Sequence, residues 1–142
     1  MVVSRTNTLL YKILGNPVLL PLVIFLVLLP VSLSINFYQN DDWCYYKTVE
    51  NFLRGSFTLH PYVGPTFYVQ GFMGMIFARF FGIGHLPVLT LLVACLSVYV
   101  FIRILHDFFE VKTIWASVLG LLYFLNPLGV YELWGFMTGH YF

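Results

Sequence analysis

The chain has 142 residues, of which 60% are hydrophobic, 20% aromatic and only 9% charged, and its formal net charge is +1. This composition, with a mean hydropathy of +0.85, is typical of membrane proteins rather than of soluble globular domains. Because the charges nearly balance, the chain has no basic surface for nucleic acid, and we expect no nucleic-acid partner. The two cysteines and four histidines are too scattered for a disulfide framework or a metal motif, so we predict no metal ligands.

The chain begins with a basic tail, residues 1–16, which contains two basic residues and no acid. The run from Pro17 to Ile35 is uncharged and, at 1.5 Å per residue, covers roughly the ~30 Å core of a bilayer. We therefore predict a transmembrane helix over residues 17–36. A secretory signal peptide is the alternative, because Ser32 and Ser34 resemble a small-residue cleavage site. Since basic residues favour the cytoplasmic side, the N-terminus is expected in the cytoplasm.

Asp41 and Asp42 follow the first span and open a short amphipathic segment on the outer face. The spacing of apolar residues predicts a helix over residues 42–54, and Gly55 stands where that helix would end. About 13 residues are too few to cross a bilayer, so this helix is expected to lie along the membrane with its aromatic side toward the headgroups. That side consists of Trp43, Tyr46, Val49, Phe52 and Leu53, and the polar side of Lys47, Glu50 and Arg54.

Residues 66–82 are either a second surface helix or another span, and two observations favour the surface helix. The segment has only 17 residues and is interrupted by Gln70 and Arg79. A surface helix also leaves four Lys or Arg residues inside and three outside, whereas a span reverses these numbers against the positive-inside rule. We predict the surface helix; a fold with four transmembrane helices is the alternative.

Two further apolar runs complete the predicted topology. Transmembrane helices are expected over residues 85–105 and 114–130, joined by a charged cytoplasmic turn at 106–113. Residues 37–84 then form the first outer loop, and residues 131–142 an outer tail. The fold class is a single all-α integral membrane domain with three transmembrane helices and two surface helices. Its outer face collects Asp41, Asp42, His60, Glu132 and His140.

The order of motifs in the outer loop is specific enough to compare with known families. An acidic pair opens a helix of the pattern DDWxYYxxxENFLxG, a His-Pro loop follows, and an aromatic-rich segment ends in Phe-Phe-Gly before the next span. This order resembles the N-terminal part of the GT-C glycosyltransferases, in particular the protein O-mannosyltransferase and aminoarabinose-transferase branch. The resemblance covers residues 15–135. Since members of that family usually have ten or more spans, the chain resembles an N-terminal fragment of one.

The resemblance implies a transferase that moves a sugar from a polyprenyl-phosphate carrier to an acceptor hydroxyl on the outer face. That reaction needs a carboxylate to accept the proton of the hydroxyl and a cation to stabilise the departing phosphate. The resemblance assigns the base to Asp41, with Asp42 beside it. The candidates for substrate binding are His60, Arg54, Arg79, Glu132 and Tyr46.

Each of these residues also has a purely structural interpretation. The acidic pair could cap the helix, and the arginines could reach lipid headgroups. The family often has an Asp after its third span and a Lys near its second surface helix, where this chain has Glu132 and His60. The cofactor is open, with a divalent metal as one candidate. A non-catalytic truncated relative or a membrane assembly subunit is the alternative function.

The expected partners are a lipid-linked sugar donor, an acceptor lipid, glycan or protein, and membrane lipids. The expected location is a bacterial inner membrane or a plasma membrane, with the active face on the periplasmic or extracellular side.

Overall fold

The computed structural model describes residues 3–34, 42–56, 58 and 71–126, without the side chains of residues 3–8, 42, 43 and 45. Within these ranges every regular element is helical, which confirms the all-α prediction for this part of the chain. The elements are α1 (Val3–Leu14), α2 (Leu19–Ser34), α3 (Asp42–Leu53), α4 (Phe72–Phe81), the 3-10 turn η2 (Ile83–His85), α5 (Leu86–Asp107) and α6 (Thr113–Phe124).

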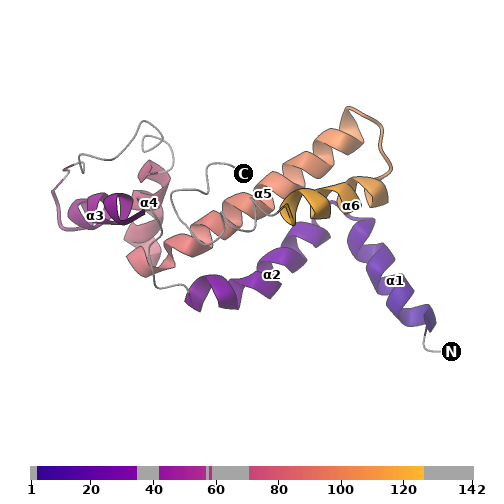
Figure 1. The fold of residues 1–142 in the computed structure, drawn as a ribbon, viewed down its shortest axis with the longest axis horizontal. Helices are drawn as coiled ribbons and strands as arrows, with labels where there is room; N and C mark the ends of the chain where they lie inside the picture. Colours follow the sequence, from indigo (N-terminus) through magenta and orange to yellow (C-terminus); the bar gives the residue numbers. More distant parts are fainter. Residues whose placement is uncertain (1–2, 35–41, 57, 59–70, 127–142) are drawn as a thin grey trace.

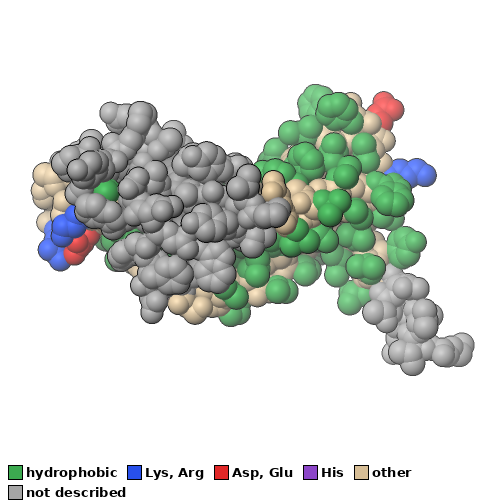
Figure 2. Space-filling view, viewed as in Figure 1, with side chains coloured by type: hydrophobic (Ala, Val, Ile, Leu, Met, Phe, Trp, Pro, Cys, Tyr) green, Lys and Arg blue, Asp and Glu red, His purple; other side chains and the backbone are tan. Residues whose placement is uncertain are grey.

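The longest helix, α5, is the axis around which the others are arranged (Figure 1). Helices α2 and α6 pack along it and make the most extensive contacts in the described structure. Helices α3 and α4 lie together at the end where α5 begins, while α1 extends from the opposite end, beside α6. On the face drawn in Figure 2, the described charged side chains gather at these two ends.

One described helix is long and apolar enough to cross a bilayer, the 25-residue segment Ile83–Asp107 formed by η2 and α5. The apolar helices Leu19–Ser34 and Thr113–Phe124 have 16 and 12 residues. Helices therefore occur in all three predicted spans, but a membrane crossing by α2 and α6 stays a prediction. The third predicted span, residues 114–130, is helical only to Phe124, because Leu125 and Asn126 form a turn before Pro127, a residue that disfavours helical geometry in the residue before it. Residues 127–130 lie outside the described residues.

A central cluster of buried side chains joins α2, α5 and α6. Along α5 these side chains recur every three or four residues, which places them on one side of the helix. Helix α6 can approach closely because Gly120 faces this side: a Cβ atom there would lie 2.7 Å from Cγ1 of Ile102. The central cluster consists of Leu20, Ile24, Leu91, Ala94, Cys95, Val98, Ile102, Ala116 and Phe124.

A separate end cluster fixes α3 and α4 to the beginning of α5. Its buried members are Cys44, Tyr46, Val49, Met75, Ala78, Leu86 and Leu89. The prediction that the apolar side of α3 faces lipid headgroups is therefore wrong for Tyr46 and Val49. The physical reason is that α4 and α5 offer apolar surface of their own, so burial within the protein removes the side chains from water. Phe52, from the same predicted side, is 37% exposed.

Residues 1–16, for which the charge pattern indicates only a basic tail, contain helix α1. The missed signal is the spacing of Leu9, Leu10, Ile13 and Leu14, which brings these four side chains to one side of a helix. The side chain of Ile13 packs against the central cluster. The tail is thus attached to the bundle through its last turn.

Candidate functional site

Helix α3 begins at Asp42, as the sequence predicted, so the second acid of the pair is its first residue. The helix ends one residue earlier than expected, and Gly55 closes it with a φ of 84°. The N–H of Gly55 donates to the carbonyl of Phe52 (3.0 Å), and that of Ser56 to the carbonyl of Asn51 (2.9 Å). This pair of bonds is a Schellman motif, in which glycine adopts the left-handed conformation without a Cβ penalty. The sequence thus defines both ends of the helix.

Several predicted site residues lie outside the part of the chain that the structure describes. Asp41, His60 and Glu132 are outside it entirely, and for Asp42 only the backbone position is described. The relative placement of the two aspartates and these other groups therefore stays a prediction. The described candidates are Tyr46, Arg54 and Arg79.

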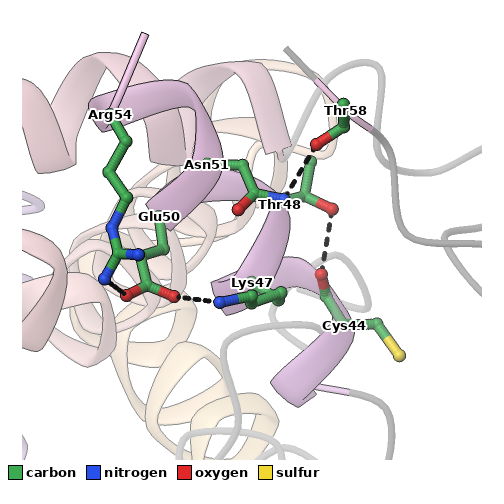
Figure 3. Close-up of polar contacts among 7 residues, drawn as sticks. All are labelled: Cys44, Lys47, Thr48, Glu50, Asn51, Arg54 and Thr58. Carbon is green, nitrogen blue, oxygen red and sulfur yellow. Dashed lines mark hydrogen bonds and ion pairs between the residues drawn. The ribbon is translucent and has the colours of Figure 1, made fainter. Parts of the chain in front are cut away.

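The exposed side of α3 carries three charged residues in one network (Figure 3). Glu50 accepts a hydrogen bond from Nζ of Lys47 at 2.9 Å, and its other carboxylate oxygen accepts one from Arg54. The hydrogen bond from Lys47, together with the positive charges of Arg54 and Lys47, lowers the pKa of Glu50, although partial desolvation opposes the shift. The sequence could have predicted this network, because its members are spaced by three and four residues.

The network changes the ranking of the two candidate arginines. The positive charge of Arg54 is balanced by Glu50, so an incoming phosphate would compete with a carboxylate already in contact. Arg79 is an exposed residue in the last turn of α4, and no ion pair or hydrogen bond involves its side chain among the described residues. Arg79 is therefore the better candidate of the two for binding an anion.

The environment of Arg79 fits a helix lying at a membrane surface. Its side of α4 also carries Phe72, Ile76 and Phe80, all exposed, while Met75 and Ala78 on the other side are buried. An exposed mixture of aromatic, aliphatic and basic side chains is typical of interfacial helices. This composition favours the surface position over a span. Residues 66–70, which begin the predicted helix, lie outside the described residues.

Tyr46 has a packing role in this structure. Its side chain is only 7% exposed and belongs to the end cluster. On the neighbouring part of α3, the hydroxyl of Thr48 donates to the carbonyl of Cys44 at 3.0 Å, and Nδ2 of Asn51 donates to the hydroxyl of Thr58 at 2.9 Å. These bonds hold α3 and the start of the following loop in place. The proposed contact of Tyr46 with a substrate stays a prediction.

Among the described residues, no group of three or more His, Cys, Asp or Glu side chains is placed to hold a metal ion. That description does not include the side chains of Asp41, Asp42 and Glu132, which are the acids of the predicted site. Comparisons with protein-family models, with curated proteins and with solved structures give no match for this chain.

Proposed function

We propose that this chain is the N-terminal module of a membrane glycosyltransferase of the GT-C type, with Asp41 as its general base. The proposal rests on the resemblance carried by DDWxYYxxxENFLxG together with one structural observation. Helix α3 begins at Asp42, and its buried side is fixed to the start of the single described helix that is long enough to span a bilayer. A carboxylate at this position would have a rigid support close to a membrane surface.

The proposed reaction transfers a sugar from a polyprenyl phosphate to an acceptor hydroxyl. The hydroxyl oxygen attacks the anomeric carbon while Asp41 accepts its proton, and the bond from that carbon to the phosphate oxygen breaks. The N-terminus of α3 favours the ionised form of a nearby carboxylate, whereas the neighbouring Asp42 opposes it. We assign the stabilisation of the departing phosphate to Arg79 before Arg54, because Arg54 already contacts Glu50.

The test is Asp41→Asn in the complete protein or assembly, assayed in membranes with a polyprenyl-phosphate sugar as donor. Removing a general base is expected to lower the rate of sugar transfer by about 10²–10⁴-fold. Glu50→Gln is the matched control, because it neutralises an acid on the same helix outside the pair. Sugar transfer at the full rate by Asp41→Asn would contradict the assignment of the base.

A non-catalytic assembly subunit is the second candidate, and the outward side of α5 favours it. Leu92, Leu96, Val100 and Ile104 are exposed at intervals of four residues, which makes a continuous apolar stripe along the helix. Further transmembrane helices of a larger protein could cover this stripe. In that case Asp41→Asn would leave sugar transfer unchanged, while Leu96→Arg would prevent assembly with those helices.

A further inference from the structure

Among the described side chains of α1, those of residues 9–14, apolar packing against the central cluster occurs at the end that joins the bundle. Leu9 and Ile13 are four residues apart and so share one side of the helix, as do Leu10 and Leu14. Ile13 packs against the central cluster. One turn earlier, where α1 extends beyond the bundle in Figure 1, Leu9 is 61% exposed and Leu10 is 55% exposed. The apolar side of the helix is therefore covered by the bundle at Ile13 and uncovered at Leu9 and Leu10.

The turn between α5 and α6 exposes aromatic side chains at the same end of the molecule. Phe108 is 82% exposed, and Phe109 and Trp115 are also exposed. The turn has defined polar contacts: the N–H of Val111 donates to the carbonyl of Leu105 at 3.0 Å, and Nδ1 of His106 donates to the carbonyl of Val111 at 3.1 Å. These hydrogen bonds fix the backbone between α5 and α6, the segment that carries Phe108 and Phe109. Helix α1 lies beside this region because it contacts α6.

The charges at this end favour an anionic partner. The sequence of α1 contains Arg5 and Lys12 and no acid. Among the described residues, no ion pair or hydrogen bond involves the exposed Lys12 side chain, whereas Arg103 is paired with Asp107 at 2.6 Å. Exposed apolar residues next to an unpaired cation on one short helix match the pattern of helices that lie in the headgroup region of anionic bilayers.

The position along α5 identifies the partner as lipid rather than a soluble protein. The first charge after the apolar core of α5 is Arg103, and the exposed aromatic residues of the turn follow directly. Tryptophan is enriched where hydrocarbon meets water, and Trp115 is exposed just after this turn. Because α1 contacts α6 beside this boundary, its exposed leucines lie at the depth where acyl chains meet headgroups.

We propose that α1 is a surface anchor that binds an anionic lipid leaflet, with Leu9 and Leu10 in the acyl region and Lys12 at the lipid phosphates. This interaction is independent of sugar transfer. It places the anchor at the opposite end of α5 from α3 and α4.

The test uses the full chain with Cys44 and Cys95 replaced by alanine and a nitroxide label at Leu10→Cys. The protein is reconstituted into phosphatidylcholine vesicles with or without phosphatidylglycerol. Collision of the label with oxygen, which is concentrated in lipid, is compared with collision with a water-soluble nickel complex. Lys12→Cys provides the matched label on the polar side of the same helix, and Leu9→Cys repeats the measurement at the neighbouring apolar position.

The proposal predicts that labels at Leu9 and Leu10 collide mainly with oxygen, that the label at Lys12 collides mainly with nickel, and that phosphatidylglycerol increases this difference. Labels at all three positions that collide equally with nickel would contradict lipid binding. Labels at Leu9 and Leu10 shielded from both reagents would indicate a covering protein and would also contradict it. Equal ratios of oxygen to nickel collisions in vesicles with and without phosphatidylglycerol would contradict the preference of α1 for anionic lipid. None of these outcomes depends on whether the chain transfers sugar.

Discussion

The two ends of α5 carry short helices that use their apolar sides differently. At the beginning of α5, α3 packs its apolar side into the end cluster, so the position of its exposed charged side is fixed relative to α4 and α5. At the other end, α1 is attached mainly through its last turn and leaves leucines uncovered. A helix whose apolar side is buried in protein can position chemical groups, whereas a helix whose apolar side is open can bind lipid.

The strongest way to break this comparison is to remove the side chain that joins α4 to α3. Met75 is 1% exposed in the end cluster, so Met75→Ala leaves a cavity and is expected to lower the free energy of unfolding by about 2–5 kcal/mol. Met73, two residues away on the same helix, is exposed, and Met73→Ala serves as the matched control with little expected change. The measurement is denaturant unfolding in mixed micelles. Equal destabilisation by both variants would contradict the packing assigned to the end cluster.

A second variant perturbs the packing near the opposite end of α5 without touching the end cluster. Gly120→Ala places a Cβ atom 2.7 Å from Cγ1 and 3.0 Å from Cδ1 of Ile102, so α5 and α6 must move apart. We expect a loss of about 1–3 kcal/mol in the free energy of unfolding from this overpacking. Gly84→Ala is the control, because a Cβ atom there meets no atom within 4 Å. In a protein that already carries Ile102→Ala, Gly120→Ala should cost less, because the Cγ1 and Cδ1 atoms that the new Cβ would meet are absent. A Gly120→Ala protein as stable as Gly84→Ala would show that the two helices are not in such close contact.

The smallest expected effect concerns the ion pairs of α3. The pKa of Glu50 is lowered in the folded protein from its ordinary value of 4.5, so ionised Glu50 stabilises the fold at neutral pH. This contribution is complete above the ordinary pKa and is lost as the pH falls through the lowered folded value. The stability difference between the wild type and Glu50→Gln should therefore stay constant from neutral pH to about pH 5 and shrink in more acidic solution. Added salt should reduce it as well, since the pair is exposed. A difference that grew on acidification would contradict the network.

The sequence predicted where the helices of this fold lie more completely than it predicted which of their side chains are buried. The uncharged run from Leu86 and the stop at Gly55 depend on local spacing, so α5 and the ends of α3 were predicted within two residues. The burial of Tyr46 and Val49 was not predicted, because it depends on α4 and α5 packing against α3, which no local pattern indicates. Helix α1 can also be predicted from the sequence, because the spacing of its leucines places them on one side of a helix. Its two basic residues indicate the charge of the segment and not its structure.

In the candidate site, too, some features follow from local sequence and others depend on the packing of the helices. The acidic pair at the start of α3 follows from sequence alone, as does the spacing that pairs Glu50 with Lys47 and Arg54. The pairing of Arg54 with Glu50 follows from this spacing, and no acid lies three or four residues from Arg79 in the sequence. The structure adds that the side chain of Arg79 is exposed while α4 packs against α3 and α5.

The central claim is that the acidic pair and the turn after α5 lie on opposite sides of the membrane. It is tested most directly with two single-cysteine proteins, Asn40→Cys and Lys112→Cys, in which both native cysteines are replaced, treated with a membrane-impermeant maleimide in intact cells. The account predicts that position 40 is labelled in intact cells and that position 112 is labelled only after the membrane is opened. Labelling of both positions from the same side, or of position 40 only after opening, would contradict it.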